Sequence, residues 1–153
     1  MIKQVKGDLL LATDDYIAHQ CNCVSKGSAG LAYYLFKKYP YANIYEQRTE
    51  PSVPGTIHIA TGERNIINMF GQYYPGGLLY PDSSKDGISA RERYFASCLK
   101  EISLIPDIKT LGFPYLIGCG IAQGNWDNYY NMIVDFAENN KNIDITIYEP
   151  DSI

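Results

Sequence analysis

The sequence predicts an α/β protein, a three-layer α/β/α sandwich around a mixed central sheet. Short apolar runs that fit strands alternate along the chain with longer segments in which apolar residues recur at helical spacing. The chain has 153 residues, and a chain of this size buries roughly 68–70% of its unfolded surface, which is enough for one core without disulfides. We therefore expect a single domain over residues 1–153.

The elements of the first half follow from these patterns. In chain order we expect strands at Met1–Val5 and Tyr16–Gln20, a helix at Leu31–Lys38, helical turns around Tyr41–Arg48, and strands at Gly55–Ala60 and Asn65–Met69. The helix ends before Pro40 because a proline disfavours helical geometry in the residue that precedes it. A turn at Thr61–Arg64 joins the last two strands.

The second half begins with a long stretch from Phe70 to Gly87 that is rich in glycine and proline. It fits either a functional loop over a ligand or a plain surface loop. After it we expect a helix from Ser89 to about Leu104, a strand at Lys109–Pro114, a helix at Trp126–Asn139 and a strand at Ile143–Tyr148. Ser89 and Glu92 have the spacing of a capping box at the start of the first of these helices.

Composition excludes several classes of protein. With 46% hydrophobic and 20% charged residues the chain is neither disordered nor of low complexity. Its formal net charge of −4 argues against broad binding to nucleic acid or to an anionic membrane. No segment approaches the roughly 18 continuous apolar residues of a membrane span, and the N-terminus does not resemble a signal peptide. We expect a cytoplasmic protein with four reduced cysteines, namely Cys21, Cys23, Cys98 and Cys119.

Two glycine-rich loops each join a predicted strand to a predicted helix. One contains Gly27–Gly30 and the other Gly118–Gly124. Glycine lets the backbone approach a ligand closely, and the helix N-terminus after each loop offers N–H groups suited to a phosphate. Neither loop is a Walker A loop, and the second is one residue too long for the dinucleotide fingerprint. Two ordinary tight turns are the alternative interpretation.

Few side chains are candidates for chemistry. His19, near the end of a strand, is a candidate acid or base, or else a structural histidine. Asp8, at the corner after the first strand, could accept a hydrogen bond from an adenine amino group or could serve only the turn. The thiols of Cys21 and Cys119 lie beside the two loops, but no Cys-His-Asp arrangement is evident from their spacing.

Several short motifs, in this order and spacing, resemble those of macro domains, which bind ADP-ribose. They are Val5–Leu10, Ala18–Cys23, Gly27–Ala32, Asn68–Gln72, Gly112–Gly120 with Trp126, and Ile145–Tyr148. The resemblance covers nearly the whole chain and is strongest to the small single-domain branch that includes ADP-ribose 1″-phosphate phosphatases. It implies an ADP-ribose or ADP-ribose-derivative ligand, with no cofactor and no metal.

The resemblance also implies a set of ligand-binding residues. Asp8 would bind the adenine amino group, Tyr148 would stack near adenine, and Asn22 would face the distal ribose. The two glycine-rich loops would wrap the diphosphate and the distal ribose. The full set is Asp8, Leu9, Asn22, Ser28, Ala29, Gly30, Leu31, Gln72, Gly118, Cys119, Gly120, Ile121, Ala122 and Tyr148.

The chain departs from one branch of the family. That branch removes ADP-ribose from proteins or DNA with a lysine in the segment that here reads Phe70–Tyr74 and lacks lysine. One of its members has an aspartate where Ile121–Gln123 stands here. We therefore expect no lysine-dependent glycohydrolase. The activity that the resemblance favours is a phosphatase acting at the distal ribose, with His19 or Asn22 near the reacting water. A non-catalytic ADP-ribose reader and another nucleotide-binding α/β domain are the alternatives.

Gln123 occupies a position where relatives would carry a small residue, often glycine. If its φ is positive, a side chain there costs about 1 kcal/mol of backbone strain relative to glycine. If its φ is negative, the Gln123 amide could reach the diphosphate or the distal ribose. We favour the first alternative.

Overall fold

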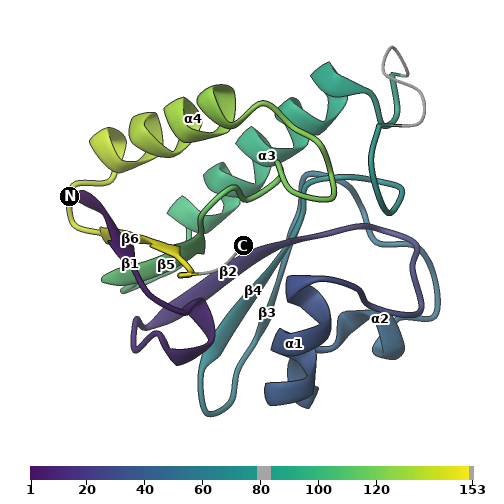
Figure 1. Cartoon of the computed structure of the whole chain (residues 1–153), viewed down its shortest axis with the longest axis horizontal. Helices are drawn as coiled ribbons and strands as arrows, with labels where there is room; N and C mark the ends of the chain where they lie inside the picture. Colours follow the sequence, from purple (N-terminus) through teal and green to yellow (C-terminus); the bar gives the residue numbers. More distant parts are fainter. Residues whose placement is uncertain (79–83, 152–153) are drawn as a thin grey trace.

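The computed structural model describes residues 1–78 and 84–151. Within them a six-stranded sheet has the order β1-β6-β5-β2-β4-β3 (Figure 1). Its strands are β1 (Ile2–Lys6), β2 (Tyr16–Cys21), β3 (Ile57–Ala60), β4 (Asn65–Phe70), β5 (Thr110–Pro114) and β6 (Asp144–Glu149). Every neighbouring pair is parallel except β3 and β4. The predicted mixed sheet is therefore confirmed.

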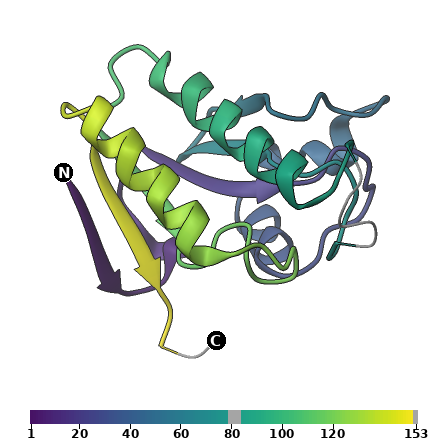
Figure 2. The ribbon, with the colours of Figure 1, turned by 90° about the horizontal axis from the view of Figure 1, so that it is seen from above.

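Helices cover both faces of the sheet, as the predicted sandwich requires. The long helices α3 (Ile88–Ser103) and α4 (Trp126–Asn139) lie side by side over one face (Figure 2). The other face carries α1 (Leu31–Lys38) and α2 (Ile44–Gln47), with the short 3-10 turns η1 (Leu9–Leu11) and η2 (Pro40–Ala42). Within the described residues no helix is both long enough and apolar enough to span a bilayer.

Alternating residues of the central strands divide the core into two. On β4, Ile67 and Met69 face α3 and α4, whereas Ile66 and Phe70 face α1. This follows from the two-residue period of a strand, which sends successive side chains to opposite faces. Both clusters exclude solvent, so β2, β4 and β5 are rigid supports for the loops that follow them.

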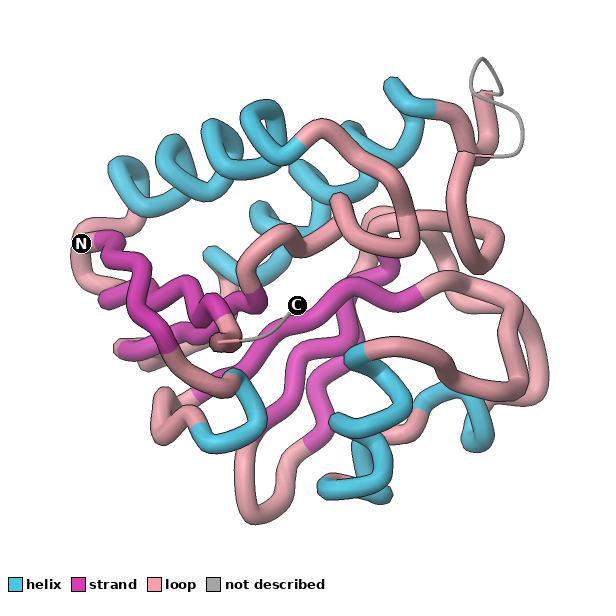
Figure 3. The backbone as a smooth tube through the Cα atoms, in the orientation of Figure 1, coloured by secondary structure: helices cyan, strands magenta, loops and turns pink. Residues whose placement is uncertain are grey.

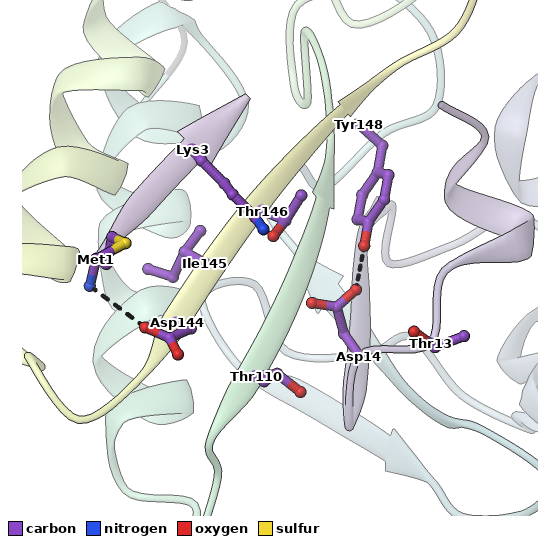
Figure 4. A pocket seen from close by; sticks show the side chains of 9 residues that line it. All are labelled: Met1, Lys3, Thr13, Asp14, Thr110, Asp144, Ile145, Thr146 and Tyr148. Carbon is purple, nitrogen blue, oxygen red and sulfur yellow. Dashed lines mark hydrogen bonds and ion pairs between the residues drawn. The ribbon is translucent and has the colours of Figure 1, made fainter. Parts of the chain in front are cut away.

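The helical layer on the α1 side does not extend over β5, β6 and β1. There a cavity of about 320 Å³ lies against the sheet (Figure 4). Its lining consists of Met1, Lys3, Thr13, Asp14, Thr110, Asp144, Ile145, Thr146 and Tyr148. Nearly all of these residues come from the amino ends of the strands or from the segment that leads into β2. The cavity is thus distinct from the glycine-rich loops, which follow the carboxyl ends.

One local prediction is wrong. α3 begins at Ile88 with Gly87 as its N-cap, so Ser89 lies inside the first turn and cannot cap the helix. The Ser89 hydroxyl instead accepts a hydrogen bond from Arg93 at 2.9 Å. The extended backbone of Gly87 makes it the N-cap, two positions earlier than a cap at Ser89 would require.

Candidate functional site

The sheet order places a topological switch between β2 and β5. From β2 the chain crosses by α1 toward β4 and β3, and from β4 it returns by α3 on the opposite face to β5. The pairing between β2 and β5 covers only Tyr16–Leu111 and Ile17–Gly112, so the carboxyl ends of the two strands separate. In open α/β sheets ligands bind at this kind of point.

Two loops follow these separated strand ends. We call residues 22–30 the first loop and residues 118–124 the second loop. Figure 3 shows them at the same end of the sheet, together with residues 71–78, which follow β4 and which we call the β4 loop. The first and second loops touch, because a Cβ atom built on Gly30 would lie only 2.9 Å from Ile121 Cδ1.

The N-terminus of α1 lies at this contact. Its N-cap is Gly30, which has no side chain with which to cap the helix. The first amides of α1 are therefore left to water or to a ligand, and no acidic residue stands in the first turn. By contrast, Asn125 caps α4 through a hydrogen bond from Asp127 N at 3.0 Å.

The second loop is a closed turn. Gly124 N donates to Gly118 O at 2.9 Å, which joins the two ends of the loop. Gly118 has φ +76, and a Cβ atom there would lie 2.5 Å from the Tyr129 ring, so the position accepts only glycine. Gly120 and Ile121 are exposed at the tip, whereas Ala122 is buried.

Asn22 organises the first loop from within. Its side-chain Oδ1 accepts from Val24 N at 3.0 Å and from Ser25 N at 2.8 Å, and its Nδ2 donates to Tyr45 at 3.3 Å. The residue is buried. Because both ends of the amide are engaged within the loop, the structure favours a positioning role for Asn22 over direct chemistry at a distal ribose.

Arg48 holds the same loop from outside. Its guanidinium donates to Asn22 O and to Ser25 O, each at 2.8 Å, and to the Ser52 hydroxyl at 3.0 Å. It also lies over the Tyr45 ring, 4.8 Å from the ring centroid. Sequence reasoning missed Arg48, because its partners in the first loop, Asn22 and Ser25, are more than twenty residues away along the chain.

His19 lies inside the core and not in the space between the loops. It is buried on the α1 side of β2, and its Nε2 pairs with Asn68 Oδ1 at 2.5 Å. Asn68 Nδ2 donates to Ala42 O, so Asn68 Oδ1 faces His19 and the proton of the neutral ring is on Nε2. Burial lowers the pKa of His19 to about 4, although the Asn68 contact opposes this shift. This geometry favours a structural histidine over the acid or base considered from the sequence.

The cysteines are equally unsuited to nucleophilic chemistry. Burial raises the pKa of Cys119 to about 12 and that of Cys23 to about 12. Burial also raises the pKa of Cys21, which is enclosed in the core beside His19. These thiols are therefore protonated at neutral pH, and a thiol is a poor nucleophile compared with its thiolate.

Gln72, predicted to bind ligand, is buried and anchors the β4 loop. Its Nε2 donates to Tyr74 O at 2.9 Å, and its Oε1 accepts from Gln20 Nε2 at 2.7 Å. Gln20 Oε1 in turn is buried close to Gly71 and Gly118, and it has no hydrogen-bond partner among the residues that the structure describes. The two glutamines thus connect the end of β2 to the β4 loop, at the place where β2 and β5 separate.

A second buried arginine, Arg91, stands on the inner face of α3. It pairs with Asp86 at 2.7 Å and donates to Gly76 O at 2.9 Å and to Ala122 O at 3.1 Å. The sequence carries a trace of this arrangement, because Arg91 falls on the stripe that continues through Phe95 and Cys98. A charged residue on an apolar stripe signals a buried ion pair, and this signal was overlooked.

The residues predicted to hold adenine lie at the far edge of the sheet. Asp8 is exposed, and its Oδ1 caps η1 by accepting from Leu10 N at 2.9 Å. Leu9 is buried in the α1-side core. The Tyr148 ring lies across Gly112, and its hydroxyl donates to Asp14 at the amino end of β2 (Figure 4). This orientation does not support adenine stacking, so that role stays a prediction.

The remaining predicted contacts belong to the accessible parts of the loops. Ala29, Gly30, Gly120 and Ile121 are exposed, and Ser28, Leu31, Gly118 and Cys119 are half-buried. No lysine occurs in residues 70–74, as the sequence shows. Lys85 nevertheless lies close to this segment, with its Nζ 3.9 Å from the Tyr73 ring centroid.

Comparison with known proteins identifies the fold. No protein-family model matches the chain, and a search of curated proteins found no match. Among solved structures, the macrodomain of Mycobacterium tuberculosis DarG aligns with a TM-score of 0.76 and 21% identity, covering 97% of each chain. An Oceanobacillus iheyensis macrodomain solved with ADPR aligns with a TM-score of 0.64 and 18% identity, over 97% of this chain and 84% of that one.

A protein of unknown function from Bacteroides thetaiotaomicron is similar to a comparable degree. It aligns with a TM-score of 0.74 and 27% identity, over 97% of this chain and 98% of that one. The alignments with the two macrodomains extend over nearly the full length of this chain. The chain therefore has the macrodomain fold, as the resemblance of its motifs predicted.

Proposed function

We propose that this chain, having the macrodomain fold, binds ADP-ribose between the first and second loops. The observation that carries the proposal is the meeting of two glycine-rich loops where β2 and β5 separate. At the same point the N-terminus of α1 presents amides that Gly30 cannot cap. Backbone amides with a helix N-terminus suit a diphosphate and need no basic side chain, which is compatible with the net charge of −4.

The strand order supports an extended nucleotide. Asp8 follows β1, and β1, β6, β5 and β2 are successive neighbours in the sheet. A ligand whose adenine contacts Asp8 would pass the end of β6 and reach the two loops with its diphosphate. Asp8 Oδ1 already accepts from Leu10 N, so the adenine amino group would approach the exposed remainder of this carboxylate.

Binding without turnover fits the geometry better than hydrolysis does. The two residues considered for catalysis, His19 and Asn22, are buried and engaged in hydrogen bonds within the protein. A phosphatase acting on ADP-ribose 1″-phosphate would need to activate a water by another group. We therefore propose an ADP-ribose reader first and the phosphatase second.

Calorimetric titration with ADP-ribose tests the binding. We expect Asp8→Ala to weaken binding by roughly 5–150-fold, which corresponds to about 1–3 kcal/mol for a lost partner of the adenine amino group. Asp15→Ala is the matched control, because Asp15 is an exposed acid at another turn. Equal affinities of wild type and Asp8→Ala would remove adenine recognition from this residue. An absence of heat with the wild type would defeat the proposal itself.

Turnover assays separate the reader from the enzymes. We expect no phosphate release from ADP-ribose 1″-phosphate and no release of ADP-ribose from a modified protein or DNA. If the wild type releases phosphate and a variant with a disrupted first loop does not, the phosphatase becomes the favoured function. Release from a modified target would show a chemistry that does not depend on a lysine in residues 70–74.

A further inference from the structure

We propose that Arg91 is a positioning residue for the ligand, because it sets the second loop and the β4 loop in one fixed arrangement. This inference rests on the proposed binding of ADP-ribose and goes further. It says that a buried ion pair, which does not itself contact the ligand, positions the loops that bind the diphosphate. The Arg91 side chain is 2% exposed and that of Asp86 is 7% exposed. Their pairing is thus almost fully removed from water.

The guanidinium of Arg91 binds three segments at once. Its Nη1 donates to Gly76 O in the β4 loop at 2.9 Å and to Ala122 O in the second loop at 3.1 Å. Its Nη2 and Nε donate to the Asp86 carboxylate at 2.7 Å and 3.1 Å. A planar guanidinium has its donors in a rigid fork, so this set of contacts fixes directions as well as distances.

Asp86 extends the same connection to the beginning of the β4 loop. Its Oδ1 accepts from Tyr73 N at 2.7 Å while it also accepts from Arg91. The acid therefore holds one end of the loop, and the arginine holds Gly76 at the other. Each carbonyl and amide concerned needs a partner once it is buried, so the loop cannot shift without losing several hydrogen bonds together.

The two loops are joined independently at the surface. Leu78 N donates to the side-chain Oε1 of Gln123 at 3.3 Å. The Gln123 amide fills the space beside Gly77, where a Cβ atom would lie only 2.4 Å from that oxygen. This outer bond is long and exposed. The inner contact through Arg91 is therefore the one that determines how the loops lie relative to each other.

A fixed second loop matters for binding because its amides must be in place before the ligand arrives. Ordering a loop on binding subtracts from affinity, whereas a preorganised loop avoids that cost. The tip at Gly120 and Ile121 is exposed, and the Ile121 side chain lies beside Gly30 of the first loop. Loss of Arg91 should therefore weaken recognition of the diphosphate and distal ribose, and should spare adenosine, which the proposal places at Asp8.

The test compares Arg91→Lys with Arg93→Lys on the full chain. Both residues lie on α3, but Arg93 is exposed and contacts only Ser89 among the hydrogen bonds described. We expect Arg91→Lys to weaken ADP-ribose binding by about 10–100-fold, because lysine cannot reproduce the bidentate and bridging contacts. Adenosine affinity, measured by NMR titration, should be the same in both variants and in the wild type.

Hydrogen exchange provides a reading that needs no ligand. In Arg91→Lys the amides of residues 119–124 should exchange faster, while those of β5 keep their wild-type rates. Asp86→Asn, which preserves an acceptor for Tyr73 N, should show the same pattern to a smaller degree. If Arg91→Lys fails to fold, the ligand titrations and the hydrogen exchange of Asp86→Asn test the inference instead.

The outcomes are distinct. Selective loss of ADP-ribose affinity with faster exchange in the second loop supports the inference. Equal losses for ADP-ribose and adenosine, or wild-type behaviour of Arg91→Lys and Asp86→Asn, overturn it. If the wild type binds no ADP-ribose, the proposed function fails. Exchange rates unchanged from the wild type would then separately reject the coupling of the two loops.

Discussion

The first and second loops look alike in sequence, yet each is held by a buried arginine in a different electrostatic setting. Arg91 contacts the second loop as one half of an ion pair with Asp86. Arg48 contacts the first loop through carbonyl oxygens, and among residues 1–78 and 84–151 no carboxylate forms an ion pair with it. Similar loops can thus be held by an arginine that is paired with a carboxylate or by an arginine that is bound only to neutral groups.

The difference has an energetic consequence. An isolated cation loses hydration without gaining a counter-charge, and desolvation accordingly lowers the pKa of Arg48. Its Nε is buried, and no described residue forms a hydrogen bond with it. The Tyr45 ring and two backbone carbonyls compensate in part. Arg48 therefore leaves a net positive charge beside the first loop. Beside the second loop, the Asp86 carboxylate neutralises the charge of Arg91.

The largest effect should follow from breaking the ion pair. Arg91→Met removes a cationic partner from the buried Asp86 carboxylate, and we expect the free energy of unfolding to fall by about 3–5 kcal/mol. The double variant Arg91→Met/Asp86→Asn should recover at least about 1 kcal/mol of this, because the buried carboxylate charge of Asp86 is then gone as well. Urea denaturation measures both. A double variant less stable than Arg91→Met would mean that hydrogen bonds, and not charge, dominate here.

Removal of Arg48 should cost somewhat less. Arg48→Met leaves Asn22 O and Ser25 O without this donor, and we expect a loss of about 2–4 kcal/mol, since each buried carbonyl costs roughly 1–3 kcal/mol. The exposed Arg93→Met is the control and should change stability by less than about 0.5 kcal/mol. If Arg48→Met matches this control, the first loop is held by Asn22 alone.

Local sequence patterns predicted the helices that follow both loops, but they did not predict the arginines that hold the loops in place. The helices at Leu31–Lys38 and Trp126–Asn139 have the predicted bounds, because capping, proline and apolar spacing act over a few residues. The hydrogen bonds of Arg48 to the first loop span 23 and 26 positions along the chain, and that of Arg91 to the second loop spans 31. No periodicity carries such information, so the loops were recognised while their anchors were missed.

The same limit applies to His19 and Gln72. His19 was considered for the site because it stands near a strand end, where ligands bind in such sheets, and Gln72 because the resemblance to macro domains implied it. The strand period alone would have sent His19 to the same face as Ile17 and Cys21, which lie in the α1-side core. Whether a polar residue at a strand end faces the ligand or the core depends on its partners, here Asn68 and Gln20.

Acid should lower the stability of the fold through His19, which lies on the strand that leads to the first loop. The pKa of His19 is about 4 in the fold against an ordinary 6.5, so between these values the unfolded chain binds a proton that the folded chain does not. Stability is therefore present above pH 6.5 and is lost as the pH falls toward 4, by up to about 3 kcal/mol.

Thermal melts between pH 4 and pH 7 measure this dependence. His19→Gln should flatten it, because glutamine does not titrate and can still donate toward Asn68. His58→Gln is the matched variant, since burial also lowers the pKa of His58, which contacts the same Asn68 at 3.1 Å. An equal flattening in both variants would show that His58 contributes as much to the pH dependence as His19, which contradicts the assignment to His19.

The smallest effect concerns Gln123, at the exposed end of the second loop. Its φ is +64, which confirms the strained alternative, and its Oε1 accepts from Leu78 N. We expect Gln123→Gly to raise the free energy of unfolding by about 0.5 kcal/mol, because relief of backbone strain outweighs one long, exposed hydrogen bond. Gln123→Ala loses the same amide but keeps a Cβ atom, so it should be less stable than Gln123→Gly by about 1 kcal/mol. Equal melting temperatures for the two variants would show that the positive φ at this position costs no measurable backbone strain.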